Sequence, residues 1–196
     1  MTRITISIPF LAALILLLGV GGLAQADVVT TGDVNPGGAG THSDPWVIGS
    51  SLYVGNSSAG TLSVTDSGVV SDLAGHIAYS STATGVVTVR ESGSHWKNSS
   101  TLSVGRRGSG ALNVESGGLV SNTLDGHIGR YLGSTGIAKV TGSGSQWNNS
   151  DDLWIGGHFA GAGGSGTLNI YNSGLVTVSD ITKLWSTGTL HLDGAA

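Results

Sequence analysis

The chain has 196 residues, of which 34 are glycine, 3 are proline and none is cysteine, and its formal net charge is −4. Charged residues make up only 10% and glycine has no three-residue period, which excludes a disordered chain and a collagen-like one. The acidic balance gives no electrostatic reason to bind nucleic acid or an anionic membrane. Because glycine is a poor helix former, strands and turns are predicted.

Residues 1–26 have the pattern of a secretory signal peptide. Arg3 precedes an apolar stretch from Phe10 to Val20, and small residues follow as far as Ala24-Gln25-Ala26. The alternative, an uncleaved membrane anchor, needs about 20 apolar residues and usually lacks an Ala-x-Ala exit. We therefore expect export, cleavage after Ala26 and a mature chain without a transmembrane segment. A secreted chain without cysteine must be stabilised by packing and backbone hydrogen bonds.

A repeat of about fifty residues organises the rest of the chain. Residues 50–72 match residues 100–122 at 10 of 23 positions, and residues 73–99 match residues 124–150 at 13 of 27. A third copy begins near Leu153 and has five extra residues in the loop at 161–164. The predicted organisation is a cap or linker at 27–45, followed by three repeats at 46–95, 96–146 and 147–196.

Within one copy, apolar residues alternate in short bursts separated by glycine-rich turns, which predicts strands too closely spaced for crossover helices. A sandwich or barrel would not need identical residues at a fixed offset, whereas a coil that stacks equivalent side chains would. We predict an all-β fold, a parallel β-helix of the usual right hand with two three-stranded rungs per repeat and about seven rungs. Three rungs of two strands per repeat are the alternative. The predicted inward positions are Leu52, Val54, Leu62, Val64 and their later equivalents.

The repeat resembles the type V secretion and PEP-CTERM-associated repeat family. Its second copy carries Leu-x-Val-Gly, Gly-x-Leu-x-Val, Gly-Gly-x-Val, Gly-x-Ile-Gly and Gly-x-Gly-Ser-x-Trp-x-Asn-Ser. The resemblance covers about residues 46–178 and implies a β-helical passenger of a bacterial exported or surface protein, not a catalytic residue. The sequence departs from the family in having neither a Pro-Glu-Pro sorting tail nor the strands of a C-terminal barrel. Either the reading frame is shortened or the protein is released without such an anchor.

Three tryptophans, Trp46, Trp96 and Trp147, recur at steps of 50 and 51 residues. An exposed row of indole rings could stack on sugars, which makes these residues candidates for carbohydrate binding. The alternative, which we favour, is that each ring closes a corner over the core and satisfies its N–H locally. Asn98 and Asn149 follow two of the tryptophans and are expected to bond the backbone at a turn.

The other repeated polar and glycine positions are expected to be structural. His76 and His127 are equivalent and should point outward, too far apart to share a metal ion. We predict no metal site and no cofactor. Gly55, Gly105 and Gly156 recur at the corners, where tight turns require positive φ.

An enzyme would need paired carboxylates, or a nucleophile with a base, on one face of a groove. The acids are scattered, and the adjacent pair Asp151-Asp152 is expected to diverge along a strand. The Arg106-Arg107 pair is expected to be an isolated, solubilising turn. We therefore expect a secreted structural or adhesive module without catalytic activity, whose partner is a surface glycan, a protein or another copy of itself. The alternative function is carbohydrate binding through the tryptophan row.

Overall fold

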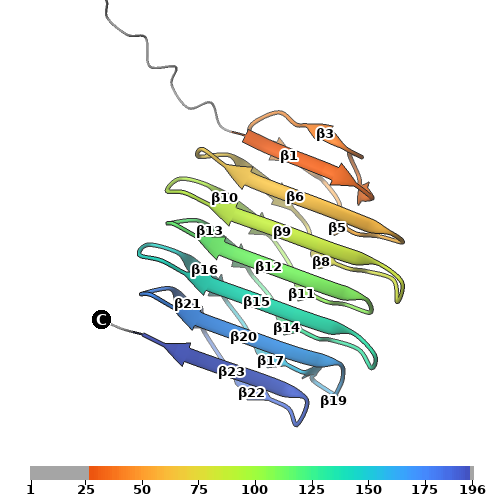
Figure 1. Cartoon of the computed structure of the whole chain (residues 1–196), viewed down its shortest axis with the longest axis vertical. Coiled ribbons are helices and arrows are strands. Elements are labelled where there is room, and N and C mark those ends of the chain that lie inside the picture. The colour runs from red at the N-terminus through yellow and green to blue at the C-terminus, as the bar shows by residue number, and fades with distance from the viewer. Residues whose placement is uncertain (1–26, 195–196) are drawn as a thin grey trace, which may run out of the picture.

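The computed structural model describes residues 27–194, which form strands joined by turns with no helix among them. The strands coil into a stack in which each turn of the coil contributes one strand to each of three sheets (Figure 1). We call one such turn a rung, made of a middle strand, a short strand and a long strand in chain order. There are six rungs. Within residues 27–194 the structure contains no helix long and apolar enough to cross a membrane.

The three sheets take one strand from each rung. The middle-strand sheet contains β4 (Trp46–Val47), β7 (Val69–Asp72), β10 (His95–Asn98), β13 (Leu119–Asn122), β16 (Gln146–Asn149) and β21 (Leu175–Val178). The short-strand sheet contains β5 (Leu52–Val54), β8 (Gly75–Ile77), β11 (Leu102–Val104), β14 (Gly126–Ile128), β17 (Leu153–Ile155) and β22 (Thr182–Leu184). The long-strand sheet contains β6 (Ala59–Thr65), β9 (Thr84–Arg90), β12 (Ser109–Glu115), β15 (Thr135–Thr141), β20 (Ser165–Tyr171) and β23 (Gly188–Asp193).

All neighbouring strands of successive rungs are parallel and in register. Gly85 of β9, for example, pairs with Gly60 on one side and with Gly110 on the other. The parallel β-helix and its two three-stranded rungs per repeat are therefore confirmed. In the fifth rung, the extra residues form a small antiparallel hairpin of β18 (Gly157–His158) and β19 (Gly161–Ala162).

Residues 27–41 form an antiparallel cap on the first rung, which is why the coil has six rungs and not the seven expected from its length. In this cap, β1 (Asp27–Gly32) pairs with β6 and with β3 (Gly40–Thr41), and β2 (Val34–Asn35) pairs with β5. The Asp33 carboxylate accepts hydrogen bonds from the backbone N–H groups of Ser57 and Ser58, at 2.6 and 2.8 Å. These bonds favour the ionised form and lower the pKa of Asp33.

The core is a single apolar column inside the coil. Leu52, Val54, Leu62 and Val64 are at most 1% exposed, so the predicted inward positions are confirmed. Apolar side chains from all three sheets continue this column from the cap to β20. Burial of successive layers of Leu, Val and Ile stabilises a chain that contains no cysteine.

The layers of this core alternate in size, which explains why the sequence repeats over two rungs and not one. Along the middle-strand sheet, the inward partners are Trp46, Val70, Trp96, Val120, Trp147 and Val176. Along the short-strand sheet, they are Leu52, Gly75, Leu102, Gly126 and Leu153. A rung with tryptophan and leucine thus follows a rung with valine and glycine.

The corner glycines Gly55, Gly105 and Gly156 have φ values of +73°, +69° and +78°. A Cβ at any of them would also meet backbone atoms of the next rung, as Gly105 shows with Thr135. Only glycine combines this backbone conformation with such a close approach at little cost. The structural role predicted for these three residues is therefore consistent with their geometry.

We predict that Gly75→Ala destabilises the protein by overpacking. A Cβ at Gly75 would clash with Asn98 Oδ1 and would lie 2.5 Å from Trp96 Cζ2 and 2.9 Å from Leu102 Cδ1, and overpacking of this kind costs about 1–3 kcal/mol. Chemical denaturation should show this loss as a lower free energy of unfolding. Gly49→Ala is the control, because a Cβ there meets nothing within 4 Å and the φ of Gly49 is not in the left-handed region. Equal losses for the two glycine variants would contradict the alternation of layers.

Candidate functional site

The tryptophans line up along the coil, but inside it. Trp96 and Trp147 are both 0% exposed, so they are not part of an exposed binding row, and the favoured interpretation, rings closed over the core, is confirmed for these two residues. Trp46 is half-buried at the capped end, where its ring stacks on His42 with 3.7 Å between the ring centroids. The reason is the strand register, which places each indole ring on the inward side of the middle-strand sheet. A sugar therefore cannot reach the rings of Trp96 and Trp147 in the folded protein.

The indole N–H groups of the two fully buried tryptophans, Trp96 and Trp147, each have an acceptor from the preceding rung, whereas Nε1 of Trp154 and of Trp185 is buried without a partner. Trp96 Nε1 donates to Asp72 Oδ2 at 2.7 Å, and Trp147 Nε1 donates to Asn122 Oδ1 at 2.8 Å. The local satisfaction expected for these N–H groups is therefore confirmed. Asn149 Nδ2 donates to the backbone carbonyls of Asp151 and Asp152, both at 2.7 Å, which confirms its predicted turn-bonding role.

The hydrogen bonds around Trp96 are fewer than those around Trp147, because Asp72 occupies the position that Asn122 has in the next repeat. Asn122 Nδ2 donates to Asn149 Oδ1. At the equivalent place, Asp72 Oδ1 and Asn98 Oδ1 are both buried acceptors without a partner. Burial raises the pKa of the Asp72 carboxyl to about 7, although the bond from Trp96 opposes this shift. A protonated Asp72 can donate to Asn98 and so take the part of the missing amide.

A groove of about 500 Å³ lies beside Asp72, at the corner between the middle-strand and short-strand sheets. Exposed Val47 and Leu73 give it an apolar wall, while Lys97, Ser99 and Thr123 add polar groups. Asp72 is the one carboxylate in its lining. The groove can accept a small polar molecule, but its lining does not supply the two carboxylates that glycoside cleavage uses.

His76 and His127 occupy the outer side of the short-strand sheet, yet they are not on the surface. Their exposed fractions are 9% and 1%, because the turns that follow the short strands fold over them. Burial, and then the charges of Arg106 and Arg130, lower the pKa of His76 to about 4. The two rings point outward from the core, as expected, but lie under a cover and not on the surface.

Three carboxylates gather where they were expected to diverge. Asp125, Asp151 and Asp152 have carboxylate oxygens within 4.8 Å of one another, and all three residues are half-buried. Asp151 and Asp152 lie in the turn between β16 and β17, and not in a strand, so strand alternation does not separate their side chains. Burial raises the pKa of Asp125, and repulsion from Asp151 and Asp152 raises it further. Close carboxylates of this kind are common on protein surfaces and do not by themselves define a metal site.

Sequence reasoning missed the residues that cover the two histidines. The corner that follows each short strand carries Tyr79 in one rung, Arg106 and Arg107 in the next, and Arg130 and Tyr131 in the one after. These positions are not identical between copies, so the repeat gave no signal for them. The Arg106-Arg107 pair is not isolated, because Arg106 packs against Tyr79 with 4.2 Å from its guanidinium carbon to the ring centroid.

The fold and the sites described above define the chain as a parallel β-solenoid protein. Comparisons with protein-family models, with curated proteins and with solved structures find no match. The resemblance to the type V secretion and PEP-CTERM-associated repeat family therefore stays a prediction.

We predict that Asp72→Asn makes the protein more stable at neutral pH. The pKa of Asp72 is about 7 in the folded state and near 3.8 in the unfolded chain. The protonated Asp72 carboxyl therefore contributes its full stabilisation below about pH 4. This stabilisation declines above pH 4 and is lost as the pH rises through 7. The slope is at most about 1.4 kcal/mol per pH unit. Urea unfolding at several pH values should show this decline in the original protein and a weaker one in the variant.

Asn122→Asp is the matched test, since it places a carboxylate at the equivalent position of the next repeat. Its stability should fall more steeply with pH than that of the original chain. Identical pH profiles for both variants and the original protein would contradict the assignment of a buried, protonated Asp72.

Proposed function

We propose that the chain is a secreted bacterial structural or adhesive module, a stiff β-solenoid that displays rows of side chains to another surface. Three observations support this proposal. The first residues carry a signal-peptide pattern, which lies outside the described residues. The repeat resembles that of exported passenger proteins. The observation that carries most weight is the straight in-register stack of six rungs.

The stack turns single outward side chains into columns. On the outer face of the long-strand sheet, Thr61, Val86, Ala111, Ile137 and Thr167 are partners in successive rungs. Neighbouring strands are about 4.8 Å apart, so a column of five spans roughly 19 Å. Each contact of such a column is weak, but many together hold a surface through multivalency.

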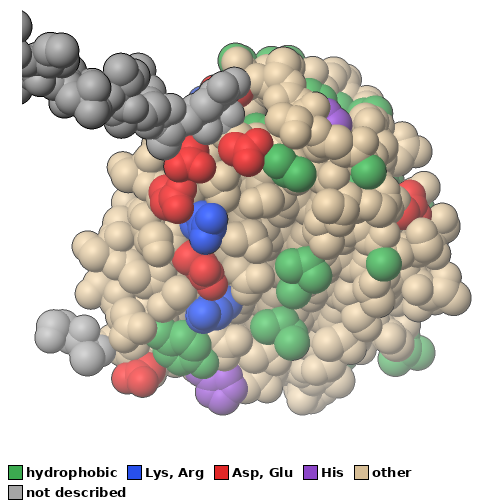
Figure 2. Space-filling view, turned by 45° about the horizontal axis from the view of Figure 1, so that its top comes forward, with side chains coloured by type: hydrophobic (Ala, Val, Ile, Leu, Met, Phe, Trp, Pro, Cys, Tyr) green, Lys and Arg blue, Asp and Glu red, His purple; other side chains and the backbone are tan. Residues whose placement is uncertain are grey.

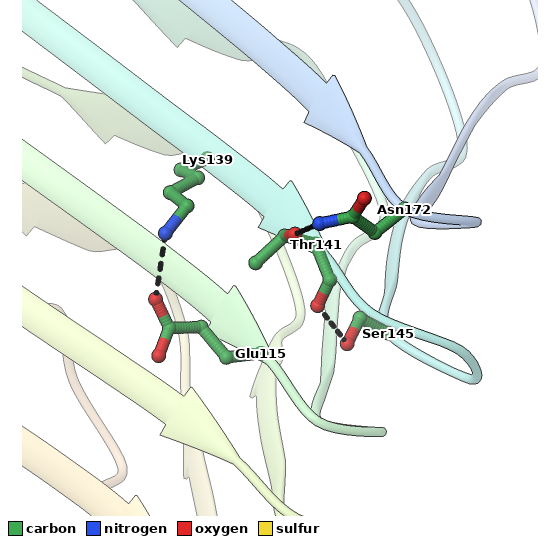
Figure 3. A network of polar contacts seen from close by, with 5 residues as sticks. All are labelled: Glu115, Lys139, Thr141, Ser145 and Asn172. Carbon is green, nitrogen blue, oxygen red and sulfur yellow. Dashed lines mark hydrogen bonds and ion pairs between the residues drawn. The ribbon is translucent and has the colours of Figure 1, made fainter. Parts of the chain in front are cut away.

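Most charges on this face lie on one side of it. Figure 2 shows acidic and basic side chains in a band, with a mostly uncharged surface beside it. The band lies over the carboxyl ends of the long strands and contains the ion pairs Arg90–Glu91 and Glu115–Lys139, at 3.7 and 3.3 Å. Figure 3 shows the second pair bridging β12 and β15, near the polar turn formed by Thr141 and Ser145. The uncharged remainder, with Val86 40% and Ile137 44% exposed, suits contact with another surface.

Two other functions receive less support. Carbohydrate binding through a tryptophan row lacks its exposed rings, and we do not propose it. The proposal also includes no catalytic step, since the groove beside Asp72 has a single carboxylate in its lining.

We predict that the exported protein begins at Asp27. The full chain should be produced in a Gram-negative host, and the secreted or periplasmic fraction should be analysed by N-terminal sequencing. Strand β1 starts at Asp27, so cleavage after Ala26 would leave the cap whole. Ala26→Arg should block cleavage, because the exit requires a small residue. A protein that stays in the cytoplasm at full length would contradict the export step.

We predict that adhesion depends on surface density and on the face of the long-strand sheet. Beads coated with residues 27–196 at high and low density should be washed over films of alginate, of collagen and of the protein itself. Retention should rise more than proportionally with density on at least one film. Val86→Lys with Ile137→Lys should remove most of it.

Leu124→Lys is the control for that experiment, since Leu124 is 46% exposed but lies outside the long-strand sheet. It should leave retention unchanged. Absence of retention on every film, or equal retention of the double variant and the original protein, would contradict the proposed role.

A further inference from the structure

Three arginines converge at the corner between the short-strand and long-strand sheets. Arg106 and Arg107 lie in the turn between β11 and β12, and Arg130 lies in the stacked turn between β14 and β15. Their guanidinium carbons are 5.5, 5.2 and 5.2 Å from the centroid of the Tyr131 ring. The backbone holds the two turns together, because Arg130 N donates to Gly105 O and Tyr131 N donates to Arg106 O.

Among residues 27–194, no carboxylate forms an ion pair with these arginines, although the charge of Asp125 acts to raise the pKa of Arg130 against the effect of burial. The two ion pairs between side chains of residues 27–194 involve Arg90 and Lys139, on the face of the long-strand sheet. The chain as a whole is acidic, with a formal net charge of −4. Three like charges around one ring repel one another, and their contacts with the Tyr79 and Tyr131 rings offset part of this repulsion. A bound anion would offset more of it.

Beneath the arginines lie the two buried histidines. Arg130 Nη1 donates to Ser103 Oγ at 3.2 Å, and Ser103 is flanked in register by His76 and His127. We name His76, Arg106, His127 and Arg130 the histidine–arginine cluster.

The cluster contains buried polar atoms without a protein partner. They are His76 Nδ1, Arg106 Nε and Nη1, both ring nitrogens of His127, and Arg130 Nε. A buried donor that lacks an acceptor costs about 1–3 kcal/mol. His127 is only 1% exposed, and burial lowers its pKa well below the ordinary value. Burial likewise lowers the pKa of Arg130. A bound anion would accept hydrogen bonds from the guanidinium groups and reduce the repulsion between their charges.

The rim of the cluster is apolar and aromatic. Leu132 and Phe159 are 89% and 73% exposed, and the His158 ring lies 5.4 Å from that of Tyr131 and 5.5 Å from that of Phe159. Exposed Arg107 adds a further charge at this rim. The C–H face of a sugar ring fits an aromatic platform, while a carboxylate or sulfate on the same sugar fits a guanidinium fork.

We propose that this corner binds an acidic saccharide, with its carboxylate or sulfate group held by Arg106 and Arg130 and its ring against Tyr131 and Phe159. Ser103, which lies in register between the two histidines, accepts a hydrogen bond from Arg130 and helps to position its guanidinium group. The proposal names a ligand class for the adhesive module and rests on that function for the choice of a saccharide. Anion binding at the cluster does not depend on adhesion.

Isothermal titration of monomeric residues 27–196 should test the site with three probes: tri-galacturonate, neutral galactotriose and sodium sulfate. Tri-galacturonate should bind at least about ten times more tightly than either of the others. Equal affinity for sulfate would overturn the saccharide and reveal a site for free oxyanions. Absence of binding by all three would overturn the site. Because the titration uses soluble monomer, it is independent of the density-dependent bead assay.

Single-residue variants should show whether the saccharide binds at this corner. Arg106→Gln and Arg130→Gln should each weaken tri-galacturonate binding about tenfold or more, whereas Arg90→Gln, a cation on another face, should not. Phe159→Ala should weaken binding of the saccharide and leave that of sulfate unchanged. Thermal melts verify that each variant is folded, and Phe159 is exposed enough for its variant to serve if an arginine variant does not fold. Unchanged affinity in folded Arg106→Gln and Phe159→Ala would overturn the assignment.

Discussion

The fit between large and small core layers is the constraint on which the rest of the structure depends. Trp96 and Leu102 of one rung project over Gly75 of the preceding rung, and Trp147 and Leu153 do the same over Gly126. Because each bulky layer needs a slim neighbour, register is fixed over pairs of rungs. A slip by one rung would stack tryptophan on tryptophan and leave a void beside glycine, so one alignment is strongly favoured.

Polar groups in this core bond across the layers. The indole N–H groups of Trp96 and Trp147 each find an acceptor one rung away, first Asp72 and then Asn122. The two acceptors differ by one atom, yet the carboxyl has a pKa near 7 and the amide has no charge to lose. The internal repeat thus contains its own comparison between an ionisable and a neutral version of the same buried contact.

The regular interior and the irregular turns have different uses. Stacked strands make a rigid support and line up outward side chains on the long-strand sheet, which suits many weak contacts. Apart from their corner glycines, the turns after the short strands do not form layers of the core, so their residues can vary from rung to rung. Tyr79, Arg106, Arg130 and Tyr131 occupy successive turns and build one cluster that no single repeat contains. The proposed adhesive face and the proposed anion site can therefore coexist on one coil.

The sequence by itself determined the parallel coil, the two rungs per repeat, the inward Leu and Val positions and the glycine corners. These follow from local alternation and from identities at a fixed offset, both of which are written along the chain. Only the tertiary structure decided that Trp96 and Trp147 face inward, since a residue on a strand has two faces and the register chooses one. It also decided the cover over His76 and His127 and the meeting of Arg106 with Arg130. Those contacts join residues in different rungs and have no repeated pattern, so their proximity exists only once the coil is closed.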